Sequence, residues 1–138
     1  MFFRKEPPPV LSIESISVKV SGMRFRHEYE IKPEGSDAVI TRYRIMIRDR
    51  QDVREPDACA KMSLDDMLSL CSSCGITGWN GFHGAHPKNV SDGEMFTFEA
   101  EVNGGEKIRA EGSANFPKHY IEFMHKLNDI LRNEDRDK

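Results

Sequence analysis

Residues 96–112 read FTFEAEVNGGEKIRAEG, and this stretch decides the fold because apolar and charged side chains alternate on both sides of a glycine-containing turn. A period of two residues is typical of a β-strand with one buried and one solvated face. A three-residue loop at 103–105 aligns the two halves so that opposite charges meet and apolar faces meet. The resulting pairs are Glu101–Lys107, Glu99–Arg109 and Ala100–Ile108. The stretch therefore predicts an antiparallel hairpin.

Two other segments have apolar positions with the helical period. The segment 64–74 is preceded by Ser63, a good N-cap, and followed by Gly75, which suits the left-handed end of a helix. Its apolar stripe consists of Leu64, Met67, Leu68, Cys71 and Cys74. The second segment begins near Pro117, and its stripe consists of Tyr120, Phe123, Met124, Leu127, Ile130 and Leu131. Both segments are predicted to be amphipathic helices with one face in the core.

Three more strands are predicted nearer the N-terminus, within 13–20, 23–31 and 41–47. A two-residue turn at Ser21–Gly22 joins the first two, which gives the pairs Val20–Met23, Val18–Phe25 and Ile16–His27. In the third strand we expect the apolar face to hold Thr41, Tyr43, Ile45 and Ile47. Its charged face would then hold Arg42, Arg44, Met46, Arg48 and Arg50, with Glu28 or Glu30 across from Arg42 or Arg44. The segment 52–61 contains Pro56 and is expected to be irregular.

The element order β-β-β-α-β-β-α has no β-α-β repeat, so it predicts an α+β fold. We expect an antiparallel sheet of about five strands with two helices packed on one face. Residues 13–133 would form this single domain. Residues 1–12, which include three consecutive prolines, are predicted to be a flexible N-terminal arm, and residues 134–138 a frayed, charged tail.

The composition excludes several classes of protein. The chain has 138 residues, 38% of them apolar and 31% charged, which is typical of a folded domain. A net charge of −3 gives no general attraction to nucleic acid or to an anionic membrane, and no apolar run approaches the roughly 18 residues of a membrane span. No signal-peptide pattern opens the sequence, and three cysteines make no disulfide framework, so we expect a cytoplasmic protein.

The segment 75–93 is the candidate site, since it is long for a connection and unusual in composition. It contains the single tryptophan, two of the five histidines and five of the ten glycines. Tryptophan is enriched at the energetically important positions of binding interfaces. We therefore expect a non-enzymatic interaction or ligand-binding module that recognises a protein or a small molecule. The expected binding residues are Trp79, Asn80, Phe82, His83 and His86.

Two alternatives remain open. Cys71 and Cys74, followed after eight residues by His83 and His86, have the ligand types and spacings of a zinc-stabilised domain. Against zinc, both cysteines lie on the apolar stripe of the first helix, where thiols are usually buried. The second alternative is an enzyme with a site between His27 and the loop. His27 alternates with core residues, so a buried imidazole bonded to a neighbour is the simpler interpretation.

The C-terminal part of the chain resembles a group of small uncharacterised bacterial proteins. The resemblance covers about two fifths of the chain and depends on four motifs: WNGF at 79–82, DG at 92–93, NGG at 103–105 and GSANFPKHY at 112–120. The pattern of that group includes neither the cysteine pair nor the two histidines of the zinc hypothesis. The resemblance supports the predicted element boundaries and implies no activity, cofactor or catalytic residue.

Overall fold

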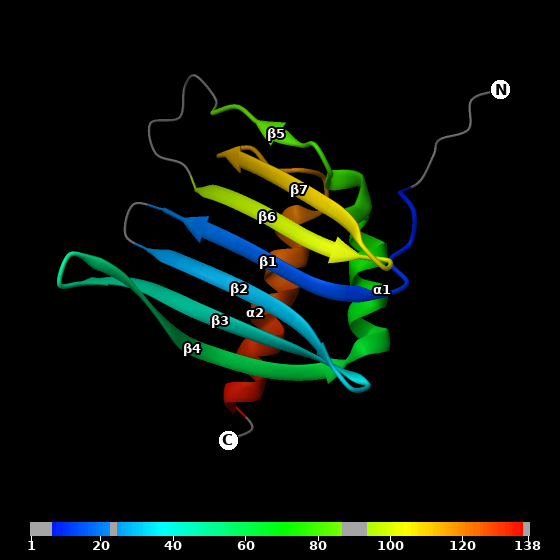
Figure 1. Cartoon of the computed structure of the whole chain (residues 1–138), viewed down its shortest axis with the longest axis horizontal. Coiled ribbons are helices and arrows are strands. Elements are labelled where there is room, and N and C mark those ends of the chain that lie inside the picture. Colours follow the sequence, from blue (N-terminus) through cyan, green and yellow to red (C-terminus); the bar gives the residue numbers. More distant parts are fainter. Residues whose placement is uncertain (1–6, 23–24, 87–93, 137–138) are drawn as a thin grey trace.

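The structure is a computed structural model that describes residues 7–22, 25–86 and 94–136. It has an α+β fold, in which one mixed sheet of seven strands packs against two helices (Figure 1). The strands are β1 (Ile13–Ser21), β2 (Arg26–Glu34), β3 (Asp37–Arg48), β4 (Gln51–Ser63), β5 (His83–Gly84), β6 (Met95–Val102) and β7 (Glu106–Ser113). The helices are α1 (Leu64–Cys74) and α2 (Tyr120–Arg136), and a short 3-10 helix, η1 (Ile76–Trp79), follows α1.

The strand order in the sheet is β4-β3-β2-β1-β6-β7-β5. Neighbouring strands are antiparallel except for β5, whose two residues run parallel to β7. β1 lies between β2 and β6, so the N-terminal strands and the β6–β7 hairpin share one sheet. The expected sheet of about five antiparallel strands is therefore right only in outline, because β4 and the short β5 extend it.

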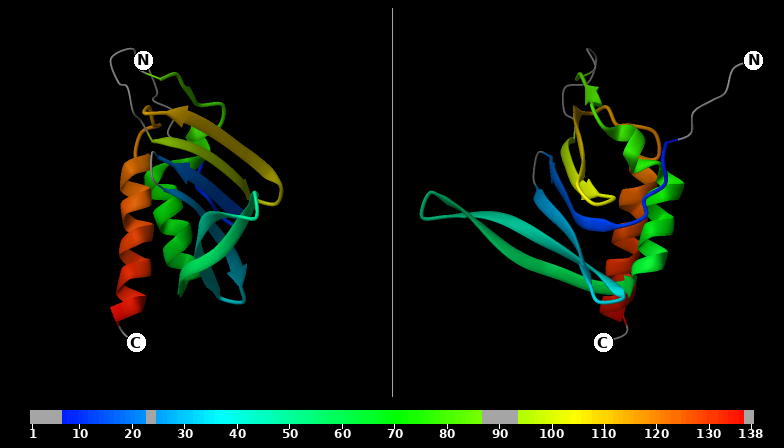
Figure 2. Two further views of the ribbon diagram at one scale, coloured as in Figure 1. Left: turned by 90° about the vertical axis from the view of Figure 1, so that its left-hand side faces the viewer. Right: turned by 45° about the vertical axis from the view of Figure 1, so that its right-hand side comes forward.

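Both helices lie on the same face of the sheet, and the opposite face has no helix over it (Figure 2). The core fills the layer between the sheet and the helices. Its fully buried side chains include Ile16, Ile31, Ile40, Phe98, Phe123 and Leu127. The far part of the β3–β4 hairpin bends away from the helices (Figure 2), so the face without helices, called the open face below, is curved.

Local signals identified α1 and the β6–β7 hairpin correctly. Ser63 caps α1, since its Oγ accepts a hydrogen bond from the backbone N–H of Asp66 at 3.0 Å. Gly75 follows the helix with a φ of 66°, the left-handed conformation that ends it. The predicted register of the hairpin, with Glu101 opposite Lys107, is confirmed.

The register of β1 and β2 differs from the prediction by four residues. The structure pairs Val20 with His27, whereas a two-residue turn would pair it with Met23, which lies outside the described residues. The connection between the two strands is residues 22–25, twice the predicted length. A shift by an even number of residues leaves every side chain on its original face. The alternation pattern therefore fits both registers equally well and could not reveal the error.

The two faces of β3 are the reverse of those predicted. Ala38 and Ile40 are buried against the helices, so alternation places Arg42 on this same face. Tyr43 and Ile45, which were expected in the core, lie on the open face. The prediction was wrong because β3 begins at residue 37, and the buried pair near its start fixes the alternation.

β4 occupies residues that were expected to be irregular. Its Ala58 and Ala60 are buried against the helices, and it pairs with β3 along its length. Pro56 lies where the register shifts, on an edge strand, where a missing N–H group is tolerated. Arg54 of β4 lies 2.6 Å from Glu28 of β2, an acid that was expected to pair with an arginine of β3.

The described part of the N-terminal arm, residues 7–12, lies against α1 and η1. The backbone N–H of Val10 donates to Ser72 Oγ at 2.9 Å, and the Val10 side chain is buried. Thr77 Oγ1 donates to the carbonyl of Pro8 at 2.7 Å. These contacts attach residues 7–12 to the domain.

Candidate functional site

Trp79, the residue that singled out the loop, is part of the core. It is only 3% exposed, and its Nε1 donates to the carbonyl of Lys118 at 2.9 Å. Its ring packs edge-on against Phe98 and Phe123, with centroid distances of 5.0 and 5.7 Å. These contacts give Trp79 a packing role in the core, and the prediction that it is a binding residue stays a prediction.

Asn80 and Phe82 fix the loop to the edge of the sheet. The Oδ1 atom of Asn80 accepts a hydrogen bond from the backbone N–H of Arg109 at 2.9 Å. Phe82 is partly buried against Phe96, and its carbonyl accepts from the N–H of Glu111 at 3.1 Å. These two predicted binding residues therefore position the next segment, which contains β5.

The four residues of the zinc hypothesis are not brought together. Cys71 and Cys74 are buried in the core, and burial, with a smaller effect of Cys74, raises the pKa of Cys71 to about 12, away from the thiolate that zinc requires. His83 and His86 are exposed at the edge of the sheet. Among the described residues no group of three or more His, Cys, Asp or Glu side chains could hold a metal ion. The zinc prediction failed because the cysteine stripe of α1 faces inward while the histidines face outward.

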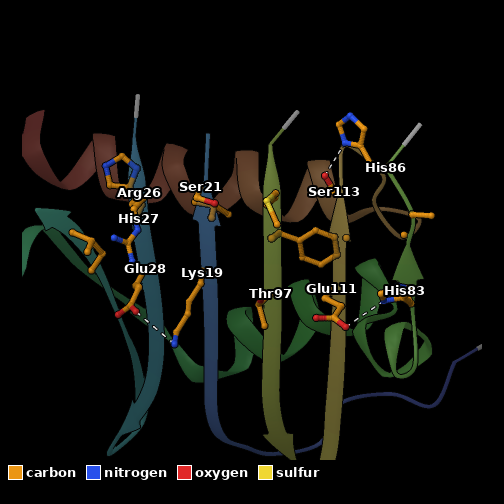
Figure 3. A pocket seen from close by; sticks show the side chains of 17 residues that line it. Lys19, Ser21, Arg26, His27, Glu28, His83, His86, Thr97, Glu111 and Ser113 are labelled. Atoms are coloured by element: carbon orange, nitrogen blue, oxygen red, sulfur yellow. Dashed lines mark hydrogen bonds and ion pairs between the residues drawn. The ribbon is translucent and has the colours of Figure 1, made fainter. Parts of the chain in front are cut away.

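A hollow on the open face is the candidate site, and His83 and His86 border it (Figure 3). It has a volume of about 380 Å³ and lies over β1, β6 and β7, between β2 and β5. Known small-molecule sites have volumes of roughly 300–1,000 Å³, so this hollow is large enough for a small ligand.

Two acid–base pairs lie on opposite sides of this hollow (Figure 3). On one side, Lys19 Nζ is 3.8 Å from Glu28 Oε1, across the β1–β2 pair. On the other side, His83 Nδ1 is 3.2 Å from Glu111 Oε1, across the β5–β7 pair. Thr97 of β6 lies between the two pairs. The Lys19 and His83 side chains are 66% and 74% exposed, and exposed pairs stabilise a fold by only about 0–1 kcal/mol. A ligand could therefore replace one member of either pair at little cost.

The rim of the hollow supplies hydrogen-bonding and apolar groups. His86 Nδ1 lies 2.8 Å from Ser113 Oγ. Met95 is 56% exposed and lines the hollow together with Ile45. An exposed methionine is a flexible apolar contact that adapts to different shapes. The hollow thus combines charged groups with a small apolar surface.

The strand at His27 borders the same hollow, but the His27 side chain points to the face of the sheet opposite to that of Glu28, its neighbour in β2. Its Nε2 is 3.6 Å from Asp57 Oδ2. Burial lowers the pKa of His27, Asp57 opposes this shift, and Arg42 and Arg44 reinforce it. The ring is therefore mainly neutral at pH 7. The imidazole therefore lies on the helix side of the sheet and not beside His83 and Glu111, and the enzyme hypothesis stays a prediction.

Sequence reasoning missed Lys19, Glu28, Met95 and Glu111 as site residues. Each of them occupies an outward position in the regular alternation of a strand, where charged residues are normal. The alternation of apolar and charged residues did predict that Lys19, Glu28 and Glu111 lie on the charged face of the sheet, but it made no prediction for Met95. Their convergence depends on the position of β1 beside β6, which joins segments that are distant in the sequence.

No protein-family model, no curated protein and no solved structure has a significant match to this chain. The comparisons therefore assign neither a family nor a function, and the resemblance to the bacterial group stays a prediction. Within the described ranges, neither α1 nor α2 is both long and apolar enough to span a bilayer. Function has to be inferred from the geometry of the hollow.

Proposed function

We propose that this chain is a small, non-enzymatic binding module that holds its ligand in the hollow on the open face. The supporting observation is that two acid–base pairs lie on opposite sides of the hollow. They are Lys19 with Glu28 and His83 with Glu111. His83 and His86 stay binding residues in this proposal, whereas the buried Trp79 does not.

A small zwitterion, such as an amino acid or a dipeptide, matches the charges of the hollow. Its carboxylate would bind Lys19 in place of Glu28, and its ammonium group would bind Glu111 in place of His83. An apolar side chain of the ligand would contact Met95. Hydrogen bonds between charged groups are stronger than neutral ones, so two such contacts would select a ligand with both charges.

Isothermal titration calorimetry with the dipeptide glycyl-leucine tests the proposal. The control ligand is the same dipeptide with an acetylated N-terminus and an amidated C-terminus, which lacks both charges. We expect saturable binding of the free dipeptide and at least tenfold weaker binding of the capped one, which corresponds to about 1.4 kcal/mol or more. Equal affinities for the two ligands would contradict the proposal.

Variants of two exposed lysines locate the site. Lys19→Met is expected to weaken binding of the free dipeptide about tenfold, because it removes the partner of the carboxylate. Lys61→Met is the matched control, since Lys61 is exposed on β4 outside the hollow, and it should bind like the native chain. Native affinity in Lys19→Met would show that the ligand binds elsewhere.

A further inference from the structure

A second, smaller cavity lies on the helix side of the sheet, between β1, β2 and α2. It has a volume of about 160 Å³, and Val20, Tyr29, Glu94, Tyr120 and Asn128 are among the residues that line it. A water molecule in the liquid occupies about 30 Å³, so this cavity has room for a ligand of several non-hydrogen atoms.

The hydroxyl group of Tyr120 is the first indication of a ligand. Tyr120 is only 1% exposed, and its hydroxyl has no hydrogen-bond partner among the residues that the structure describes. Buried polar groups without a partner are rare because they are costly. The ring is fixed by stacking on Phe116, with a centroid distance of 5.0 Å and an interplanar angle of 2°. The packed ring therefore fixes the position of the hydroxyl oxygen, where the described residues supply no partner.

Glu94 supplies a negative charge near that hydroxyl. Its carboxyl is half-buried, and burial raises its pKa. Glu94, Tyr29 and Tyr120 line the same cavity, and burial, with smaller effects of Glu94 and Tyr29, raises the pKa of Tyr120. Within the described ranges no basic side chain forms an ion pair with Glu94. The acids on the open face differ in this respect, since Glu28 and Glu111 each have a basic partner.

The remaining polar groups define what the cavity can accept. Tyr29 donates its hydroxyl proton to Asn128 Oδ1 at 2.9 Å, and Arg42 Nη1 donates to the same atom at 3.0 Å. Asn128 Nδ2 donates to the carbonyl of Met124 at 3.0 Å, so the Asn128 amide is already engaged on both sides. The Tyr29 oxygen also interacts with the Arg42 guanidinium, so it is not a free acceptor. The acceptor groups of the cavity are therefore the Tyr120 phenol and the Glu94 carboxylate, which have three oxygens between them.

We propose that this cavity binds a small primary ammonium group, with its charge beside Glu94 and its N–H groups directed at the oxygens of Glu94 and Tyr120. An ammonium group has three N–H donors, which is the number of oxygens in these two groups. This site is separate from the hollow on the open face and does not depend on the proposed function.

Methylammonium chloride is the probe, and NMR titration of the full chain is the measurement. We expect saturable changes in the ring resonances of Tyr120 and the amide resonance of Glu94. Methanol has the same size without the charge, and sodium acetate has the opposite charge, so neither should produce a saturable change at the same concentrations. Equal changes with methanol and methylammonium would overturn the proposal, because they would show a cavity that takes any small polar molecule.

Two variants distinguish the ammonium site from a general salt effect. Glu94→Gln keeps the size of the side chain and removes its charge, and it is expected to weaken methylammonium binding at least tenfold. Tyr120→Phe keeps the packed ring and removes one acceptor, so it should weaken binding about threefold or more. Glu122→Gln is the matched control on the exposed side of α2 and should bind like the native chain. Native affinity in both Glu94→Gln and Tyr120→Phe would overturn the proposal.

Discussion

At the scale of single residues, burial assigns the aromatic side chains to packing rather than recognition. The glycine-rich surroundings of Trp79 indicated an exposed loop, but its side chain is buried and its indole N–H donates to the carbonyl of Lys118. That carbonyl precedes α2 and is distant in the sequence, so no local pattern could predict the contact. The same packing leaves the Tyr120 hydroxyl without a hydrogen-bond partner among the described residues.

Trp79→Ala tests this assignment. It is expected to lower the free energy of unfolding by about 3–5 kcal/mol, because it removes a large buried side chain and leaves a cavity. Urea denaturation measures the change. Ile47→Ala is the control, since Ile47 is 71% exposed and its truncation should change stability by about 0.5 kcal/mol or less. Similar small effects in both variants would mean that Trp79 is not part of the core.

Tyr120→Phe and Tyr29→Phe form a matched pair. Tyr29→Phe removes a hydrogen bond to Asn128 and should cost about 0.5–1.5 kcal/mol of unfolding free energy. Tyr120→Phe removes a buried hydroxyl without a described partner, and should leave stability unchanged or raise it, because burying such a group costs about 1–3 kcal/mol. Thermal and urea unfolding in the absence of amines measure both. A loss for Tyr120→Phe as large as that for Tyr29→Phe would reveal a partner for the hydroxyl.

At the scale of elements, the sequence predicted those parts whose signals are local. Periodicity and caps identified α1, and turn length with charge pairing identified the β6–β7 register. β4 was missed because an edge strand exposes much of its backbone and tolerates polar residues and Pro56. The faces of β3 were reversed because Tyr43 and Ile45 resemble core residues, whereas Ala38 and Ile40 determine the orientation.

Gly75→Ala tests the junction between α1 and the N-terminal arm. Gly75 has a φ of 66°, and an added Cβ would lie 3.2 Å from Cγ of Pro7. The left-handed conformation alone costs about 1–2 kcal/mol for a residue with a Cβ. Gly35→Ala is the control, since Gly35 has a φ of 63° and open space around its Cα. Chemical denaturation should show a larger loss for Gly75→Ala, and equal losses would mean that the contact with Pro7 is unimportant.

At the scale of the whole molecule, the candidate site arises from the order of the strands. β1 joins β2 on one side and β6 on the other, which places the Lys19–Glu28 pair and the His83–Glu111 pair at one hollow. The sequence predicted the helices on one face and the charged open face, but not this convergence, because strand order is not a local property. The loop was singled out for its tryptophan, yet among its described residues only His83 to His86 line the hollow.

Global stability should depend on pH in part through His27. Burial lowers its pKa in the folded state, so the unfolded chain takes up the proton first as the pH falls. The stabilisation is therefore complete above the unfolded-state pKa and is lost as the pH falls through the lower folded-state value. His27→Gln should show a smaller loss of unfolding free energy between about pH 7.5 and about pH 5.5 than the native chain does. An identical loss in the two proteins would contradict this account of His27.

The most direct test of the central claim is NMR mapping of the backbone amides during titration with glycyl-leucine. If the hollow on the open face is the binding site, the largest saturable shifts will cluster at Lys19, Thr97 and Glu111. The amides of α1 and of the β3–β4 turn will stay in place. Saturable shifts confined to the helices or to the β3–β4 turn, or no shift at all, would contradict the account.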